Sequence, residues 1–176
     1  MIPKYLEGKD LPKHLQIALD FQGITEIVGS KSNPLILSWA KELGLSDIYT
    51  NDDTAWCGLF FAICAKRSGR ELPTFKDKYD YLRALKYCGI WLPVMTKDAS
   101  VGDVLIFQRP SGGHIGFYVA ESLTSYFVLG GNQGNSVSIS EIAKSRCVAI
   151  RRPKYDTLKV VAVHLGSGGK LSENEA

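Results

Sequence analysis

The chain has 176 residues, of which 45% are hydrophobic and 22% are charged, and its formal net charge is +3. This composition predicts one globular domain with a substantial hydrophobic core. The weak charge and the lack of a basic stripe exclude a typical nucleic-acid-binding protein. No apolar run reaches the roughly 18 residues of a membrane-spanning helix, so we expect no membrane segment.

The N-terminal segment MIPKYLEGKDLPKHLQ lacks the charged and then apolar pattern of a secretory signal. We therefore expect a protein that is made in the cytoplasm without a signal peptide. The cysteines, at positions 57, 64, 88 and 147, form no C-x-x-C pair and do not have the spacing of a zinc site. We expect free thiols, no metal and no cofactor.

The first half of the chain begins with two predicted helices. Residues 12–23 carry apolar side chains at helical spacing. Residues 33–45 have clear boundary signals, because Asn33 can cap the helix, Pro34 fits its first position and Gly44 can end it.

Two further helices are predicted after a polar loop. The first covers residues 55–69, with Asp53 or Thr54 as its candidate cap. The second covers residues 76–89 and ends at a glycine.

The second half of the chain consists of short apolar segments separated by glycines and polar turns. The predicted strands cover residues 100–107, 114–120, 126–131, 137–140 and 148–153, with an extra edge strand over 160–165. Helices followed by strands predict an α+β fold in which a helical N-terminal half packs on an antiparallel sheet.

Cys57 directly follows Trp56 near the predicted start of the third helix. A thiol in the first turn of a helix lies near unpaired backbone N–H groups and the positive end of the helix dipole, which favour the thiolate. The same N–H groups are candidate donors to an oxyanion. Cys57 is therefore a candidate nucleophile, although a buried structural cysteine is the common alternative.

A cysteine nucleophile needs a nearby base, and the chain has three histidines. His14 lies on the first predicted helix without polar company, and His164 lies near the C-terminus, so we expect a surface or half-buried side chain for both. His114 follows the glycine-bearing loop RPSGG and begins an apolar strand, which makes it the candidate base.

The hairpin that begins at His114 suggests a third group. If residues 121–125 form its loop, His114 lies opposite Asn132 and Gly116 lies opposite Gly130, all on one face of the sheet. The two glycines would leave room on this face for the start of the cysteine helix. The Asn132 side chain could then orient His114, whereas a simple turn-forming role in GGNQGN is the alternative.

Four segments together resemble the small cell-wall cysteine hydrolases, a family related to NlpC-type peptidases and CHAP amidases and often found as phage endolysins. They are NPLILSWAKELG, NDDTAWCGLFFAICAKRSG, VGDVLIFQRPSGGHIGFYVA and VLGGNQGNSVSIS. The resemblance implies a papain-like α+β fold, with a catalytic domain at residues 13–155 between an N-terminal arm, 1–12, and an extra strand and flexible tail, 156–176.

The resemblance also assigns roles to residues. It implies Cys57 as the nucleophile, His114 as the base and Asn132 as the orienting residue, with the adjacent Gln133 as the alternative if the register differs. Gly102 and Asp103 would form a turn into a strand. The residues before Cys57 are candidates for binding or orienting a substrate, or for capping the helix: Asp52, Asp53 and Trp56.

The expected activity is hydrolysis of an amide bond in bacterial peptidoglycan through a thioacyl-enzyme, by an endopeptidase or an N-acetylmuramoyl-L-alanine amidase. Such a protein would act as a monomer on the cell wall after release by a phage or a secretion system. Two alternatives are a catalytically silent module that binds peptides or the wall, and an amidohydrolase or transferase that acts on another amide.

Overall fold

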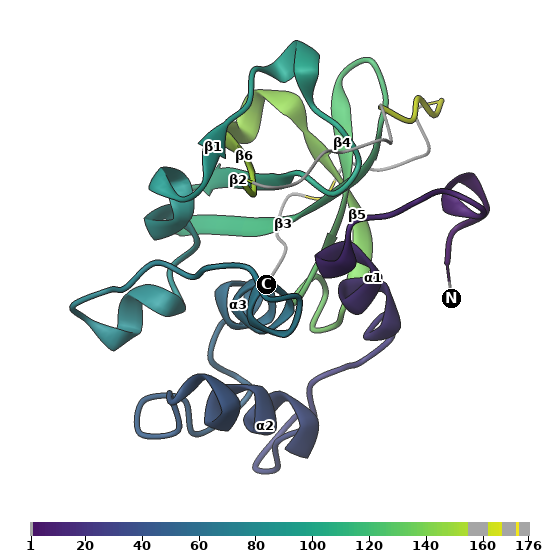
Figure 1. The fold of residues 1–176 in the computed structure, drawn as a ribbon. Coiled ribbons are helices and arrows are strands. Elements are labelled where there is room, and N and C mark those ends of the chain that lie inside the picture. The colour runs from purple at the N-terminus through teal and green to yellow at the C-terminus, as the bar shows by residue number, and fades with distance from the viewer. Residues whose placement is uncertain (1, 155–161, 167–171, 173–176) are drawn as a thin grey trace.

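The computed structural model describes residues 2–154, 162–166 and 172, and it combines helices with an antiparallel sheet (Figure 1). This mixed architecture confirms the predicted α+β class. The three α-helices are α1 (Lys13–Asp20), α2 (Pro34–Leu43) and α3 (Cys57–Arg67). The strands are β1 (Leu92–Pro93), β2 (Val104–Arg109), β3 (Gly112–Glu121), β4 (Ser125–Gly130), β5 (Ser138–Ala143) and β6 (Cys147–Arg152).

The sheet has the strand order β1-β6-β2-β3-β4-β5, and every pair of neighbours is antiparallel. The described residues also form short 3-10 helices: η1 (Lys4–Leu6), η2 (Lys78–Tyr81), η3 (Ala84–Gly89), η4 (Thr96–Asp98) and η5 (Lys144–Arg146). Within the described part of the chain, no helix is long and apolar enough to cross a membrane.

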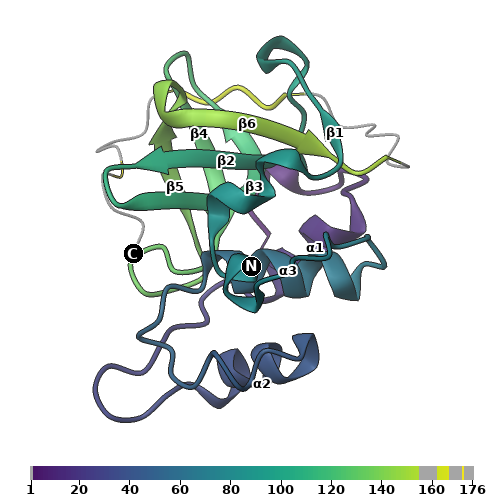
Figure 2. The same cartoon turned by 90° about the vertical axis from the view of Figure 1, so that its left-hand side faces the viewer.

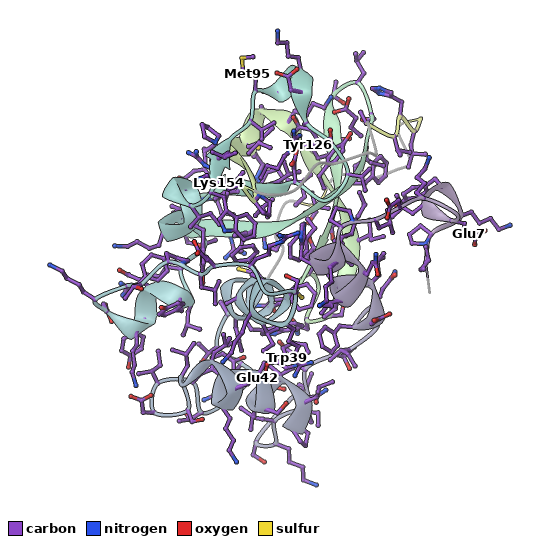
Figure 3. All side chains as sticks on the ribbon, in the orientation of Figure 1. Glu7, Trp39, Glu42, Met95, Tyr126 and Lys154 are labelled. Atoms are coloured by element: carbon purple, nitrogen blue, oxygen red, sulfur yellow. The ribbon has the colours of Figure 1, made fainter. Side chains whose placement is uncertain are left out.

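Helix α3 lies between the sheet and α2, and both ribbon views show this layering (Figure 2). Every residue of α3 from Cys57 to Ala65 is buried. Helix α3 is apolar on all sides over this range, as a helix that is covered all round must be. Trp39 is labelled in Figure 3. It packs from α2 against Trp56 and Phe60, with ring centroids 6.1 and 5.8 Å apart.

The local signals around α2 are confirmed. The Asn33 side chain accepts a hydrogen bond from the N–H of Leu35 at 2.9 Å, Pro34 is the first helical residue and Gly44 takes the left-handed conformation with φ of 74°. These residues satisfy the unpaired groups at both ends of the helix, so sequence and structure agree there.

The predicted helix over residues 76–89 is two 3-10 helices, η2 and η3, instead. The hydroxyl of the buried Tyr87 donates a hydrogen bond to the carbonyl oxygen of Tyr81 at 2.8 Å. That carbonyl would accept from the backbone N–H four residues later in a continuous α-helix. Burial of Tyr87 thus coincides with a break between the two short helices.

The register of the β3–β4 hairpin agrees with the prediction at one end only. Phe117 pairs with Leu129 and Tyr118 with Val128, as predicted. A bulge then shifts the pairing by one residue, so that Ala120 pairs with Phe127 and not with Tyr126. The extra residue shortens the connecting loop. At the other end the described pairing stops at Phe117, so the predicted pairs His114–Asn132 and Gly116–Gly130 are not among those of the two strands.

The sheet buries apolar side chains on both faces, which corrects the expected position of the cysteine helix. Phe117 packs against Phe60 and Phe61 of α3, with ring centroids 6.3 and 5.8 Å apart. The His114 ring stacks instead with Phe107 at 6.5 Å on the opposite face. Helix α3 therefore covers the more apolar face, because its all-apolar surface matches that face best.

Part of the predicted edge strand over residues 160–165 lies outside the described residues. In the described part, His164 forms one isolated parallel bridge with Glu121, and its Nδ1 atom lies 3.4 Å from a Glu121 carboxylate oxygen. Its side chain is 74% exposed, in agreement with the expected surface position.

His14 is buried, which corrects the expectation that it lacks polar company. Its Nε2 atom lies 2.7 Å from the carbonyl oxygen of Gly102. Gly102 has a φ of 96°, and a Cβ atom there would lie 2.6 Å from Cγ of Pro12. A glycine is therefore required where α1 packs on the turn into β2, the structural role expected for Gly102 and Asp103.

Asp103 forms a buried ion pair with Arg152 beside this turn. Two hydrogen bonds join the Arg152 guanidinium to the carboxylate, at 2.7 and 2.8 Å, and the N–H of Ser100 donates a third at 2.8 Å. The Asp103 side chain is fully buried. The pair links β6 to the start of β2 by well-directed, charge-assisted bonds.

We expect Arg152→Met to destabilise the protein by about 3–5 kcal/mol, because it leaves the Asp103 carboxylate buried without its counter-charge. Urea unfolding followed by circular dichroism measures the loss. The double variant Asp103→Asn, Arg152→Met should recover part of it. Equal stability of Arg152→Met and the wild type would contradict this account of the pair.

Candidate active site

Cys57 is the first residue of α3, and Trp56 occupies the N-cap position. Among the described residues no side chain caps the helix, which corrects the expected cap by Asp53 or Thr54. The backbone N–H groups of Cys57 and Gly58 lower the pKa of the Cys57 thiol by hydrogen bonding and so favour its thiolate. An uncapped helix start thus leaves its donors to the nucleophile candidate.

Burial opposes this effect and raises the pKa of the Cys57 thiol above its ordinary value. The positive charge of Arg109 and hydrogen bonds from backbone N–H groups lower the pKa, but by less than burial raises it. Cys57 is only 4% exposed. At neutral pH the Cys57 thiol of the resting site is therefore protonated, and Arg109 and the backbone N–H groups stabilise its thiolate form.

The third N–H group that bonds the sulfur belongs to Ile115 on β3. Tyr118 directs its N–H and C=O toward Asp103 and Gly102, on the β2 side of β3. Alternation along the strand turns the N–H of Ile115 to the β4 side. The described β3–β4 pairing stops at Phe117, so no residue of β4 is paired with Ile115 on that side.

His114 immediately precedes Ile115, so the sulfur contacts the peptide unit that joins these two residues. The imidazole is 1% exposed. Its Nε2 atom lies 3.0 Å from Oε1 of Gln133. The partner of His114 is therefore Gln133, the alternative candidate. The predicted hairpin register had favoured Asn132 at this place.

The Gln133 side chain is fixed by two backbone carbonyl groups. Its Nε2 atom donates to the carbonyl oxygen of Val128 at 3.1 Å and to that of Ser138. These bonds identify the amide nitrogen, so Oε1 must be the atom that faces His114. An oxygen can only accept, and His114 therefore carries its proton on Nε2, which leaves Nδ1 as the basic atom of the neutral ring.

Asn132 has a left-handed backbone with φ of 58° in the turn between β4 and β5. Asparagine is one of the few residues that adopt this conformation readily, and the turn-forming alternative accounts for it. The turn directs the following residue, Gln133, to the imidazole. A Cβ atom at Gly130 would lie 3.0 Å from Nε2 of His114, so a glycine there makes room for the pair.

The residues before Cys57 have structural contacts. Asp52 is buried and accepts hydrogen bonds from the N–H groups of Ile27, at 3.1 Å, and Asn33, at 2.7 Å. Trp56 is buried and its Nε1 atom donates to Glu26 at 3.1 Å. Asp53 is exposed and is the member of this group that could meet a substrate.

A pocket of about 410 Å³ opens beside Cys57. Two walls form it, one from the segment around η3 and one from the β2–β3 hairpin; its lining residues beyond Ala55 and Cys57 are Leu82, Arg83, Ala84, Leu85, Lys86, Arg109, Ser111, Gly112 and Gly113. Cys57 lines this pocket, whereas His114 is not among its lining residues. The basic residues of the lining were not predicted from the sequence, although Arg109 in the segment RPSGG before His114 was an available signal.

The other cysteines are free thiols, as expected of Cys64, Cys88 and Cys147. Cys64 is buried in α3, and burial raises its pKa well above the ordinary value. Among the described residues, His, Cys, Asp and Glu side chains form no group of three or more that could hold a metal ion.

Comparison with known proteins gives no independent assignment. No family model matches the chain, and a search of curated proteins finds no match. The chemistry of this site must therefore be argued from the side chains and their contacts.

Gly58→Ala tests the packing that holds the pocket against α3. A Cβ atom at Gly58 would lie 2.6 Å from the carbonyl oxygen of Tyr81 and 2.9 Å from that of Leu82. We expect a loss of roughly 1–3 kcal/mol in the free energy of unfolding, because backbone must move. Gly89→Ala is the matched control, since its Cβ meets nothing within 4 Å. Equal melting temperatures of the two variants would contradict this packing.

Proposed function

We propose that the protein is a papain-like cysteine amidohydrolase that cleaves an amide bond in bacterial peptidoglycan. One observation carries the proposal: the Cys57 sulfur, at the start of α3, bonds the peptide N–H that follows His114, whose ring Gln133 holds in one tautomer. A nucleophile, a base and an orienting group from three separate segments are the parts that thiol hydrolysis requires.

In the first half of the proposed reaction, the Cys57 thiol gives its proton to Nδ1 of His114 past the edge of β3 where its pairing with β4 has ended, and the sulfur attacks the amide carbonyl carbon. A C–S bond forms, and the carbonyl π electrons move to oxygen. The backbone N–H groups at the start of α3 are the candidate donors to this oxyanion. Collapse of the intermediate breaks the C–N bond, and the imidazolium protonates the departing amine.

In the second half, His114 removes a proton from water, which attacks the thioester carbonyl. The C–S bond breaks, the product leaves as a carboxylic acid and the thiol is restored. Gln133 acts throughout as a positioning residue, because it contacts the imidazole and not the reacting atoms. Since Cys57 lines the pocket, substrate would approach the sulfur from the pocket side.

Peptidoglycan as substrate rests on the sequence resemblance described above. The scissile bond would lie within the stem peptide or at the muramyl–alanine junction. The protein would act as a monomer, after release from the cytoplasm by a phage or a secretion system. A silent binding module of the same fold is the rival proposal, and the Gln133 network argues against it, because such a module has no need for a fixed tautomer.

Hydrolysis of purified cell walls tests the activity. We expect the wild type to release new amino groups, and Cys57→Ala and Cys57→Ser to lose at least roughly 10³-fold in rate, because no comparable nucleophile remains. Mass spectrometry of the muropeptides identifies the bond. Unchanged release by Cys57→Ala would remove the assignment of the nucleophile, and wall binding without release by the wild type would favour the binding module.

Gln133→Leu should lower kcat by roughly 10²-fold, because His114 loses the acceptor that fixes its tautomer. Nitrogen NMR of the imidazole gives a second readout: the proton should reside on Nε2 in the wild type and be shared between both nitrogens in the variant. Gln16→Leu, at an exposed position of α1, is the matched control. An unchanged tautomer in Gln133→Leu would contradict the positioning role.

A further inference from the structure

The pocket beside Cys57 carries three basic side chains and, among the described residues that line it, no acidic one. Arg83 and Lys86 belong to the wall around η3, and Arg109 ends β2 in the opposite wall. A concave surface lined by charges of one sign concentrates ions of the other sign. The three cations therefore favour an anionic ligand next to the nucleophile candidate.

The three cations differ in their surroundings. Arg83 pairs with Asp80 at 2.9 Å and with Asp77 at 3.4 Å, and Lys86 pairs with Asp80 at 3.1 Å. These carboxylates offset the charge of the η3 wall, and both basic side chains are about half exposed. Solvent screens such exposed pairs, so their individual contributions are small.

Arg109 is half-buried, and its field reaches the nucleophile. Its positive charge is the largest influence that lowers the pKa of Cys57. The guanidinium thus lies within electrostatic reach of the sulfur while it lines the same pocket. A ligand group between them would contact both.

We propose that this pocket selects amide substrates that carry a free carboxylate close to the scissile bond, with Arg109 as the group that binds the carboxylate. A planar guanidinium matches a carboxylate in shape and can donate two parallel hydrogen bonds to it. The cavity volume of about 410 Å³ fits an organic group of several heavy atoms. The substrate class rests on the proposed hydrolase function, whereas the anion preference of the pocket can be measured without it.

Alkylation of Cys57 measures that preference directly. Iodoacetate and iodoacetamide form the same C–S bond with loss of iodide, and they differ mainly in charge. Peptide mass spectrometry follows the rate of each reagent at Cys57. We expect the ratio of the iodoacetate rate to the iodoacetamide rate at Cys57 to exceed the same ratio for free cysteine. Arg109→Gln should lower the Cys57 ratio by roughly three- to tenfold, and Arg109→Lys should retain most of it.

Two controls separate the effect of Arg109 from other charges. Lys97→Gln removes an exposed cation in η4 that does not line the pocket, and it should leave the ratio unchanged. Arg109→Gln should have the same effect in a His114→Gln background, which removes the imidazolium as a source of positive charge. Iodoacetamide, being neutral, corrects both comparisons for altered access to the sulfur.

A salt series on the wild type requires no variant. The ratio should fall toward the free-cysteine value between about 0.01 M and about 1 M NaCl, as screening removes the attraction. A ratio that equals that of free cysteine at low salt, or that is unchanged by Arg109→Gln, overturns the proposal.

Substrate pairs then connect the pocket to catalysis. Of two synthetic wall peptides that differ only by one carboxylate or its carboxamide beside the scissile bond, the carboxylate form should be cleaved at least roughly tenfold faster, and Arg109→Gln should remove this preference. Cleavage of both forms at equal rates overturns the selection and leaves the hydrolase function standing. No cleavage of either form, with an Arg109-dependent alkylation ratio, refutes the hydrolase and retains the anion pocket.

Discussion

The site depends on one contact, between the sulfur of Cys57 and the backbone N–H of Ile115. Buried backbone N–H groups require a partner, and the β3–β4 pairing stops at Phe117. A hydrogen bond from the Ile115 N–H to the Cys57 sulfur joins the start of α3 to the strand where its pairing has ended. The same contact brings the nucleophile candidate beside His114, because the bonded amide is the one that follows it. Cys57 thus takes part both in the packing of α3 on the sheet and in the proposed chemistry.

Two glycines allow α3 to come this close. Gly58 passes beneath the carbonyl groups of Tyr81 and Leu82, and at Gly131 a Cβ atom would lie 2.5 Å from Cβ of Phe60. Any side chain at either position would push a loop away from the helix. One loop forms a wall of the pocket and the other carries Gln133, so close packing of backbone on α3 positions both the substrate space and the group that orients the base.

The parts that could be predicted from sequence are those that depend on local chemistry. Asn33 and Gly44 mark the ends of α2 because caps act within one turn. The partner of His114 could not be fixed in this way. Extending the hairpin register beyond Gly130 favours Asn132, but the strand ends there, and bonds to Val128 and Ser138 decide which side chain turns inward. Arg83, Lys86 and Arg109 likewise meet only through the tertiary packing of η3 on the sheet.

Burial, nearby cations and the charge of the substrate have opposing effects on the pKa of the Cys57 thiol. Burial raises the pKa of Cys57, and an incoming carboxylate would raise it further, since two negative charges at close range repel. Arg109 opposes both effects, because one guanidinium can bind the carboxylate and still lower the energy of the thiolate. A neutral residue there would leave the pocket able to hold a substrate but would make proton transfer to His114 harder in its presence. The position of Arg109 between the pocket and the sulfur therefore links recognition of an anionic substrate to activation of the nucleophile.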